Sequence, residues 1–192
     1  MSKARQPRTL LKLRDLEERG LSRMAVGRMV NRGELVRVHR GLYAEPDAGL
    51  SEHHDLAVVA ARAPTAVVCL LSAAALHRLG TQAPHEVWIA LPPRTWAPSI
   101  RKPPVRVVRF SGARYDDGIE EHVVEGVHVR VYSIGKTVVD LFRYRNKVGL
   151  DVALEALREA RRNRRCSLAE LTRLAQRGRV LGPMRPYLES LA

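Results

Sequence analysis

Hydrophobic residues at the start of the chain recur with a helical period. Residues 10–19 place leucines on one side of a helix, and Gly20 ends it. A second helix is predicted after Ser22, because the serine hydroxyl can accept a free backbone N–H of the first turn. Gly33 supplies its stop. Two short amphipathic helices joined by a tight turn are therefore expected.

A basic two-stranded ribbon is predicted directly after these helices. Residues 35–38 and 42–44 read as strands, and Gly41 allows the tight turn between them. Helix, turn and basic hairpin form the order of a winged helix-turn-helix, in which the second helix enters the DNA major groove. Arginine and asparagine on that helix suit base edges, and basic groups on the ribbon suit phosphates. The candidate DNA contacts are Arg23, Arg28, Asn31, Arg32, Arg37, His39 and Arg40.

The pattern changes after a linker-like segment at residues 45–49, and helices then alternate with short apolar strands. Strands are predicted over 66–70, 87–91, 105–110, 119–124 and 127–132, and helices over 51–62, 72–79, 135–145, 149–163, 167–177 and after 183. The predicted fold class is α+β. Residues 1–46 are expected to form a winged helix-turn-helix, and residues 50–192 an α+β domain with a small, mostly antiparallel sheet and a helical C-terminal region.

The charge of the chain indicates which class of partner it binds. It has 33 Lys and Arg against 20 Asp and Glu, a net charge of +13, and the excess lies at the two ends. Residues 1–46 carry +6, residues 47–134 carry zero and residues 135–192 carry +7. This distribution favours nucleic acid or an acidic protein as partner. No apolar run is long enough for a membrane span, so a cytoplasmic protein is expected.

Candidate chemistry is sparse. The two cysteines, Cys69 and Cys166, lack metal or redox spacing and are expected to be reduced. The stretch Gly135-Lys136-Thr137 lacks the upstream glycine of a phosphate-binding loop and is interpreted as a helix start capped by Ser133. The seven histidines show no ligand spacing. No catalytic residue, metal or cofactor is expected, and a nuclease built on Asp116, Asp117, Glu120 and Glu121 is the weakest alternative.

Arginines cluster near the end of a predicted C-terminal helix, in the stretch REARRNRR at 158–165. The helix macrodipole favours cations at a helix C-terminus, by roughly a few tenths of a kcal/mol for each cation. A second nucleic-acid contact is an equally good interpretation of this cluster.

Four stretches together resemble the AbiEi antitoxins of bacterial type IV abortive-infection toxin–antitoxin systems. They are SRMAVGRMVNRGELVRVHRGLYA, VVCLLSAAALHRLGTQAPHEVWIALP, VRVVRFSG and YSIGKTVVDLFRYRNKVGLDVALEALREA. The resemblance implies a winged helix that binds inverted repeats in its own promoter and represses it. It also implies a neighbouring toxin, an AbiEii-like nucleotidyltransferase, that the C-terminal domain counteracts. Members usually have one more helix before the first, for which this chain has little room.

The resemblance also marks a candidate C-terminal functional surface. Arg143, Arg145, Asn146 and Lys147 match the family's C-terminal block, whose role the motif does not define. With the arginine cluster, the surface comprises Arg143, Arg145, Asn146, Lys147, Arg161, Arg162, Arg164 and Arg165. The alternative to a DNA-binding antitoxin is a protein-interaction module, in which the winged helix docks the toxin or another acidic partner.

Overall fold

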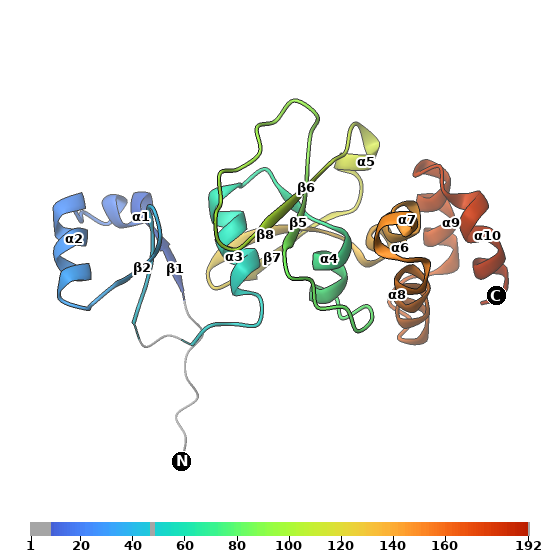
Figure 1. Cartoon of the computed structure of the whole chain (residues 1–192), viewed down its shortest axis with the longest axis horizontal. Helices are drawn as coiled ribbons and strands as arrows, with labels where there is room; N and C mark the ends of the chain where they lie inside the picture. Colours follow the sequence, from blue (N-terminus) through green and yellow to red (C-terminus); the bar gives the residue numbers. More distant parts are fainter. Residues whose placement is uncertain (1–8, 47–48, 192) are drawn as a thin grey trace, which may run out of the picture. The chain divides into compact units, whose positions relative to one another are not determined.

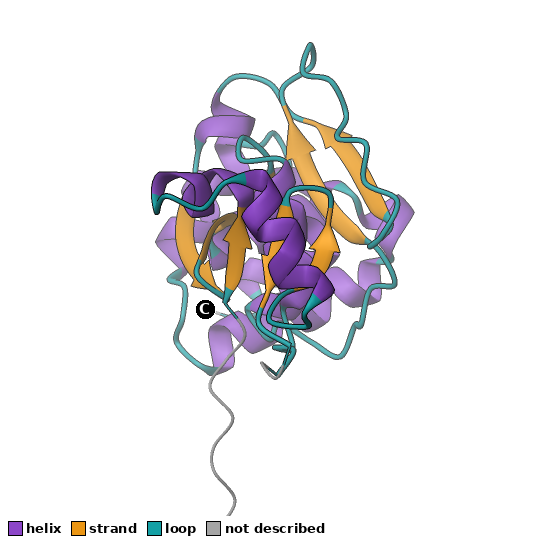
Figure 2. Ribbon diagram, turned by 90° about the vertical axis from the view of Figure 1, so that its left-hand side faces the viewer, coloured by secondary structure: helices purple, strands orange, loops and turns teal. Residues whose placement is uncertain are grey.

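The computed structural model describes residues 9–46 and 49–191, which form ten helices and eight strands (Figure 1, Figure 2). The α+β class predicted from the sequence is therefore confirmed. Contacts group the chain into two compact units, one of residues up to 64 with 122–129, the other of 65–121 with 130 onward. The linker predicted at 45–49 includes residues 47 and 48, which lie outside the described part. No described helix is long and apolar enough to cross a membrane.

The first unit has a three-stranded sheet in the order β1-β3-β2, and a pair of helices lies between its first and second strands in the chain. A small core of Leu16, Val26 and Leu35 joins the helices to the strands. Residues 122–129, which belong to a hairpin later in the chain, are also part of this unit. Its other elements are β1 (Leu10–Lys12), α1 (Leu13–Glu18), α2 (Arg23–Asn31), β2 (Val36–His39), β3 (Leu42–Ala44) and α3 (His54–Arg62).

The second unit is built on a five-stranded sheet in the order β6-β5-β4-β8-β7. Its strands are β4 (Val67–Val68), β5 (Val87–Leu91), β6 (Val105–Arg109), β7 (Ile119–Val124) and β8 (Val127–Tyr132). Glu125 and Gly126, both with positive φ, form the predicted turn between β7 and β8. The helices are α4 (Leu70–Leu76), α5 (Ala113–Asp116), α6 (Ile134–Arg143), α7 (Arg145–Val148), α8 (Leu150–Arg162), α9 (Leu168–Arg177) and α10 (Leu181–Glu189).

The helix predicted over residues 10–19 is wrong in its first turn. Residues 10–12 form β1 and pair with β3, so that Leu10 lies opposite Ala44 and Lys12 opposite Leu42. The Leu10 amide also donates to the Glu125 carbonyl at 2.8 Å. These partners satisfy the backbone in an extended conformation, and helix α1 begins only at Leu13. The expected two-stranded ribbon is thus a three-stranded sheet.

The sheet of the second unit is mixed, which corrects the prediction of a mostly antiparallel one. Strand β4 pairs with β5 in antiparallel fashion, but β4 with β8 and β5 with β6 are parallel. Two neighbouring parallel strands need a long crossover between them. The proline-rich loop 92–104 supplies that crossover between β5 and β6 without a helix.

The helix predicted over 51–62 begins later than expected, because its proposed first turn is used for another contact. Ser51 donates its backbone N–H to Glu125 Oε1 at 2.9 Å, and α3 begins at His54. His54 Nδ1 also lies 2.8 Å from Glu125 Oε2.

The helix predicted over 72–79 instead spans Leu70–Leu76, and Ser72 inside it accepts the Trp88 backbone N–H at 2.9 Å.

Helix α6 forms the centre of the second unit, and its residues 135–142 are all buried. Ser133 caps this helix by accepting the Lys136 backbone N–H at 3.3 Å, which confirms the predicted cap. Lys136 and Asp140 are buried one turn apart, and the lysine Nζ donates to Asp140 Oδ2. Lys136 therefore neutralises a buried carboxylate within the fold.

Candidate nucleic-acid interface

Helices α1 and α2 are joined by a compact four-residue turn over residues 19–22. Gly20 has a φ of +87°, a backbone conformation that glycine adopts without strain, and its N–H donates to the Glu17 carbonyl at 2.9 Å. Ser22 then accepts the Ala25 backbone N–H at 3.2 Å and caps α2 as predicted. Two helices joined by a short glycine-containing turn are the arrangement of a helix-turn-helix.

The outer face of α2 carries the predicted base-reading residues. Arg28 and Asn31 are exposed, and the side chain of Arg23 is 78% exposed. Met24 lies on the same face and is also 78% exposed, although it is apolar. An apolar tip beside arginine and asparagine suits the thymine methyl group and the base edges of a major groove. Val26 faces the opposite way and is 1% exposed.

Two of the predicted DNA-contacting arginines are already paired with carboxylates. Arg23 Nε lies 2.8 Å from Glu17 Oε1 of α1, and this contact is the main reason that the pKa of Arg23 is raised. Arg32 Nε lies 2.8 Å from Glu34 Oε1. Exposed pairs of this kind are weak and can exchange for a phosphate. Both arginines therefore remain available to DNA, at the cost of leaving a carboxylate.

Arg37 and Arg40 of the β2–β3 hairpin are exposed to solvent, whereas His39 makes contacts within the fold. His39 Nδ1 lies 2.5 Å from Arg62 Nη1 and accepts the Arg40 backbone N–H at 2.7 Å. Burial, helped by the charges of Arg62 and Arg37, lowers the pKa of His39. The imidazole is therefore neutral near neutral pH, and it orients Arg62 without itself supplying a positive charge.

A basic hollow beside the hairpin turn was not predicted from the sequence. It has a volume of about 280 Å³, and its cationic lining residues are Lys12, Arg14, Arg40 and Arg62. Arg62 also donates to the Arg40 carbonyl at 3.2 Å. The hollow is assembled from β1, α1, the hairpin turn and α3. The sequence shows these basic residues but not that they lie together, because no local motif places α3 beside the hairpin.

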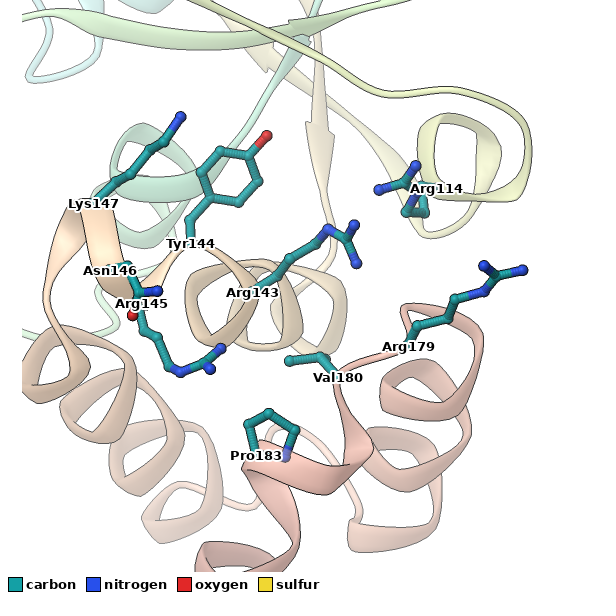
Figure 3. Close-up of a pocket in the computed structure, with 9 residues that line it drawn as sticks. All are labelled: Arg114, Arg143, Tyr144, Arg145, Asn146, Lys147, Arg179, Val180 and Pro183. Atoms are coloured by element: carbon teal, nitrogen blue, oxygen red, sulfur yellow. The ribbon is translucent and has the colours of Figure 1, made fainter.

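The structure divides the candidate C-terminal surface into two places. Arg143, Arg145, Asn146 and Lys147 line one pocket (Figure 3). The arginine cluster instead surrounds the end of α8, where Arg161 donates to the Cys166 carbonyl at 3.1 Å and Arg165 to the His77 carbonyl. Arg162 lies 3.9 Å from Glu159, and Arg164 has a φ of +52°. Arg161 and Arg165 thus have structural roles.

Asp117, one of the carboxylates considered for a nuclease, is already paired within the fold. Asp117 Oδ2 lies 3.0 Å from Arg177 Nε, so its charge is already balanced within the fold. Asp116 lies at the end of the four-residue helix α5, next to the turn that leads into β7. Turn chemistry accounts for both residues, as the sequence suggested.

Comparison with known proteins relates this chain to a regulator family and to one fold. Residues 4–46 match the family described as transcriptional regulator, AbiEi antitoxin, which is less than a quarter of the chain. No curated protein matches the chain. The crystal structure of the RV2827C protein from Mycobacterium tuberculosis is similar with a TM-score of 0.58 and 20% identity, over 88% of this chain and 66% of that one.

These two findings differ in what they show. The likeness to RV2827C shows a shared fold, and the chain spans 66% of the length of that protein. The family match covers β1, α1, α2 and the β2–β3 hairpin, and so includes the exposed Arg28, Arg37 and Arg40. The N-terminal segment of this chain is therefore similar to the transcriptional regulators of the AbiEi antitoxin family, which supports a regulator and antitoxin role.

Proposed function

We propose that this chain is a DNA-binding antitoxin that represses its own operon in a type IV toxin–antitoxin system. In this proposal the first unit is a winged helix-turn-helix that binds inverted repeats in the promoter. The second unit counteracts a neighbouring nucleotidyltransferase-like toxin in the cytoplasm. The proposed function is non-enzymatic and requires no cofactor.

The observation that carries the proposal is the coincidence of the family match with the basic helix and hairpin. The match ends at residue 46, two residues beyond β3. Within it, Arg28 and Asn31 lie exposed on α2, and Arg37 and Arg40 lie exposed on the hairpin. A recognition helix followed by a basic ribbon places base-reading and phosphate-binding groups in the order that a winged helix requires.

The proposal is tested by fluorescence anisotropy with the full chain, a labelled promoter duplex and a shuffled duplex of the same composition. Arg28→Ala is expected to weaken promoter binding by about tenfold or more and shuffled binding much less, because a base contact is lost. Arg40→Ala is expected to weaken both duplexes alike, because phosphates are the same in every sequence. Arg173→Ala, an exposed substitution on α9 outside every candidate contact, is the charge-matched control and is expected to change neither affinity.

Salt dependence gives a second measurement of the same interface. If Arg23, Arg28, Arg32, Arg37 and Arg40 each neutralise one phosphate, log K falls with log salt at a slope of about −4.5. A slope near zero, or equal losses on both duplexes for Arg28→Ala, would reject DNA reading by α2. Capture of the neighbouring gene product without any promoter binding would favour the protein-interaction module instead.

A further inference from the structure

The second unit contains a pocket whose charge is entirely positive. It has a volume of about 500 Å³, within the range of small-molecule sites. Five of its nine lining residues are cationic and none is acidic. Figure 3 shows that these residues come from separate elements. The lining residues are Arg114, Arg143, Tyr144, Arg145, Asn146, Lys147, Arg179, Val180 and Pro183.

Three arginines form the centre of this basic pocket. Arg114 comes from α5, Arg143 ends α6, and Arg179 lies in the turn between α9 and α10. In Figure 3 the Arg143 guanidinium points between those of Arg114 and Arg179. The same three residues line an adjoining hollow of about 270 Å³. Guanidinium groups from three separate parts of the fold therefore line both hollows.

Hydrogen bonds to the backbone hold two of the arginines in place. Arg143 Nη1 donates to the Gly178 carbonyl at 2.7 Å, and Arg145 Nη1 donates to the Phe142 carbonyl at 2.9 Å. These contacts engage carbonyl oxygens that would otherwise repel an anion. A guanidinium carries five N–H donors, so most donors of each arginine stay available to a ligand.

The positive charge of the basic pocket is not balanced by nearby side chains. Among the described residues, none of its five cations forms an ion pair with a carboxylate. Asp140 interacts electrostatically with Arg143 and Arg114, but this carboxylate is buried and already accepts a hydrogen bond from Lys136. A concentration of like charge around a concave space attracts a multivalent anion.

We propose that the basic pocket binds the oligophosphate chain of a nucleotide. Arginine forks match phosphate oxygens, and three of them around one space suit several adjacent phosphates. A nucleic-acid backbone spaces its single charges along a strand, whereas an oligophosphate concentrates three or four charges within a volume that this pocket can hold. Tyr144, Val180 and Pro183 add an apolar wall that a base or ribose can contact.

The test is isothermal titration calorimetry of the full chain at physiological ionic strength. The probes are inorganic tripolyphosphate, ATP, GTP, CTP, UTP and a single-stranded oligonucleotide of about 12 nucleotides, long enough to cover a strand-binding groove. Tripolyphosphate and the nucleotides are expected to compete for one saturable site. Equal affinity assigns the site to the phosphate chain alone, and tighter nucleotide binding adds a contact to the base or ribose.

Variants locate the site without disturbing the fold. Arg114→Gln and Arg179→Gln each remove one charge and no hydrogen bond seen in the structure, and each is expected to weaken binding by about tenfold or more. Arg173→Gln, an exposed arginine of α9 outside the pocket, is the control and is expected to leave affinity within about twofold. Unchanged circular dichroism melting establishes that each variant is folded.

Three outcomes would overturn the proposal. The first is the absence of binding by tripolyphosphate and every nucleotide at millimolar concentration. The second is an equal loss in Arg173→Gln, which would make the binding a response to net charge. The third is binding of the oligonucleotide alone, which would identify a nucleic-acid surface. Promoter binding through α2 is measured separately with Arg28→Ala, so either proposal can fail without the other.

Discussion

Replacing Lys136 with methionine is expected to remove a large part of the stability of the second unit. The lysine side chain is 5% exposed and bonds to Asp140, which is 4% exposed. Its Nζ also lies 4.4 Å from the ring centroid of Tyr132 and 4.8 Å from that of Phe110. Loss of the cation leaves a buried carboxylate unpaired, which costs about 3–5 kcal/mol. Whole domains are stable by only about 5–15 kcal/mol.

Removing both partners separates the pair from its surroundings. Buried ion pairs replaced by apolar residues of similar volume are often neutral or stabilising, so Lys136→Met with Asp140→Leu should recover most of the loss, to within about 1 kcal/mol of the wild type. Urea unfolding followed by far-ultraviolet circular dichroism gives the free energy of unfolding for each variant. The double-mutant cycle then yields the coupling energy.

The deficit of Lys136→Met should also depend on pH. Burial raises the pKa of Asp140, against the opposing charge and hydrogen bond of Lys136. An acid with a raised pKa favours the folded state at low pH, and this contribution is lost as pH rises through the folded-state pKa. Without Lys136 that pKa rises further, so the deficit should be large at neutral pH and shrink toward about pH 4. A deficit independent of pH, or a double variant as unstable as the single one, would refute this reasoning.

Three further changes test other parts of the structure. Glu17→Gln frees Arg23 from its ion pair and should tighten DNA binding by about two- to fivefold in anisotropy, whereas an unchanged Kd would mean that Arg23 does not reach DNA. Ser133→Ala removes the cap of α6 and should lower the free energy of unfolding by about 1 kcal/mol in urea, against no change if the cap is dispensable. Burial raises the pKa of the Cys69 thiol, and burial together with the Glu170 hydrogen bond raises the pKa of Cys166 to about 12. Alkylation of both buried thiols in the folded protein at neutral pH should therefore be slow, and rapid modification would contradict this.

Local sequence signals predicted most of the second unit. Strands β5, β7 and β8 have the predicted bounds, because β-branched apolar runs are separated there by turn residues. Glu125 and Gly126 both adopt positive φ, as a two-residue hairpin turn demands. Helices α6, α8 and α9 begin and end within two residues of the prediction, because all three have a clear apolar periodicity and serine caps begin α6 and α9.

Non-local pairing accounts for what the sequence did not predict. Leucines at 10, 13 and 16 have helical spacing, yet the first turn is extended because β3 and Glu125 offer it partners far along the chain. The parallel pairs of the large sheet have the same origin, since strand direction depends on the path of the loop 92–104 and not on the composition of either strand. Tertiary contacts thus override a local preference that is correct in itself.

The candidate interface was predictable in its exposure and not in its pairing. Helical periodicity alone placed Arg28 and Asn31 on the outer face of α2 and Val26 in the core. The bond between Arg23 and Glu17 spans the turn between two helices, and Arg62 reaches His39 from α3. Both contacts depend on how elements pack, so residue type and spacing could not reveal them.

The proposed phosphate site likewise depends on how the elements pack and not on a local motif. The stretch Gly135-Lys136-Thr137 has the letters of a phosphate loop, but its lysine is 4% exposed and serves Asp140. Arg114 and Arg179 belong to no motif, and yet the fold brings them beside Arg143 in the lining of the basic pocket. A charge is useful to a ligand only when it is accessible and unpaired, and neither condition can be read from local spacing. Lys136 meets neither condition, whereas Arg114 and Arg179 form no ion pair in the described structure, which is why they, and not the lysine, are the residues to substitute.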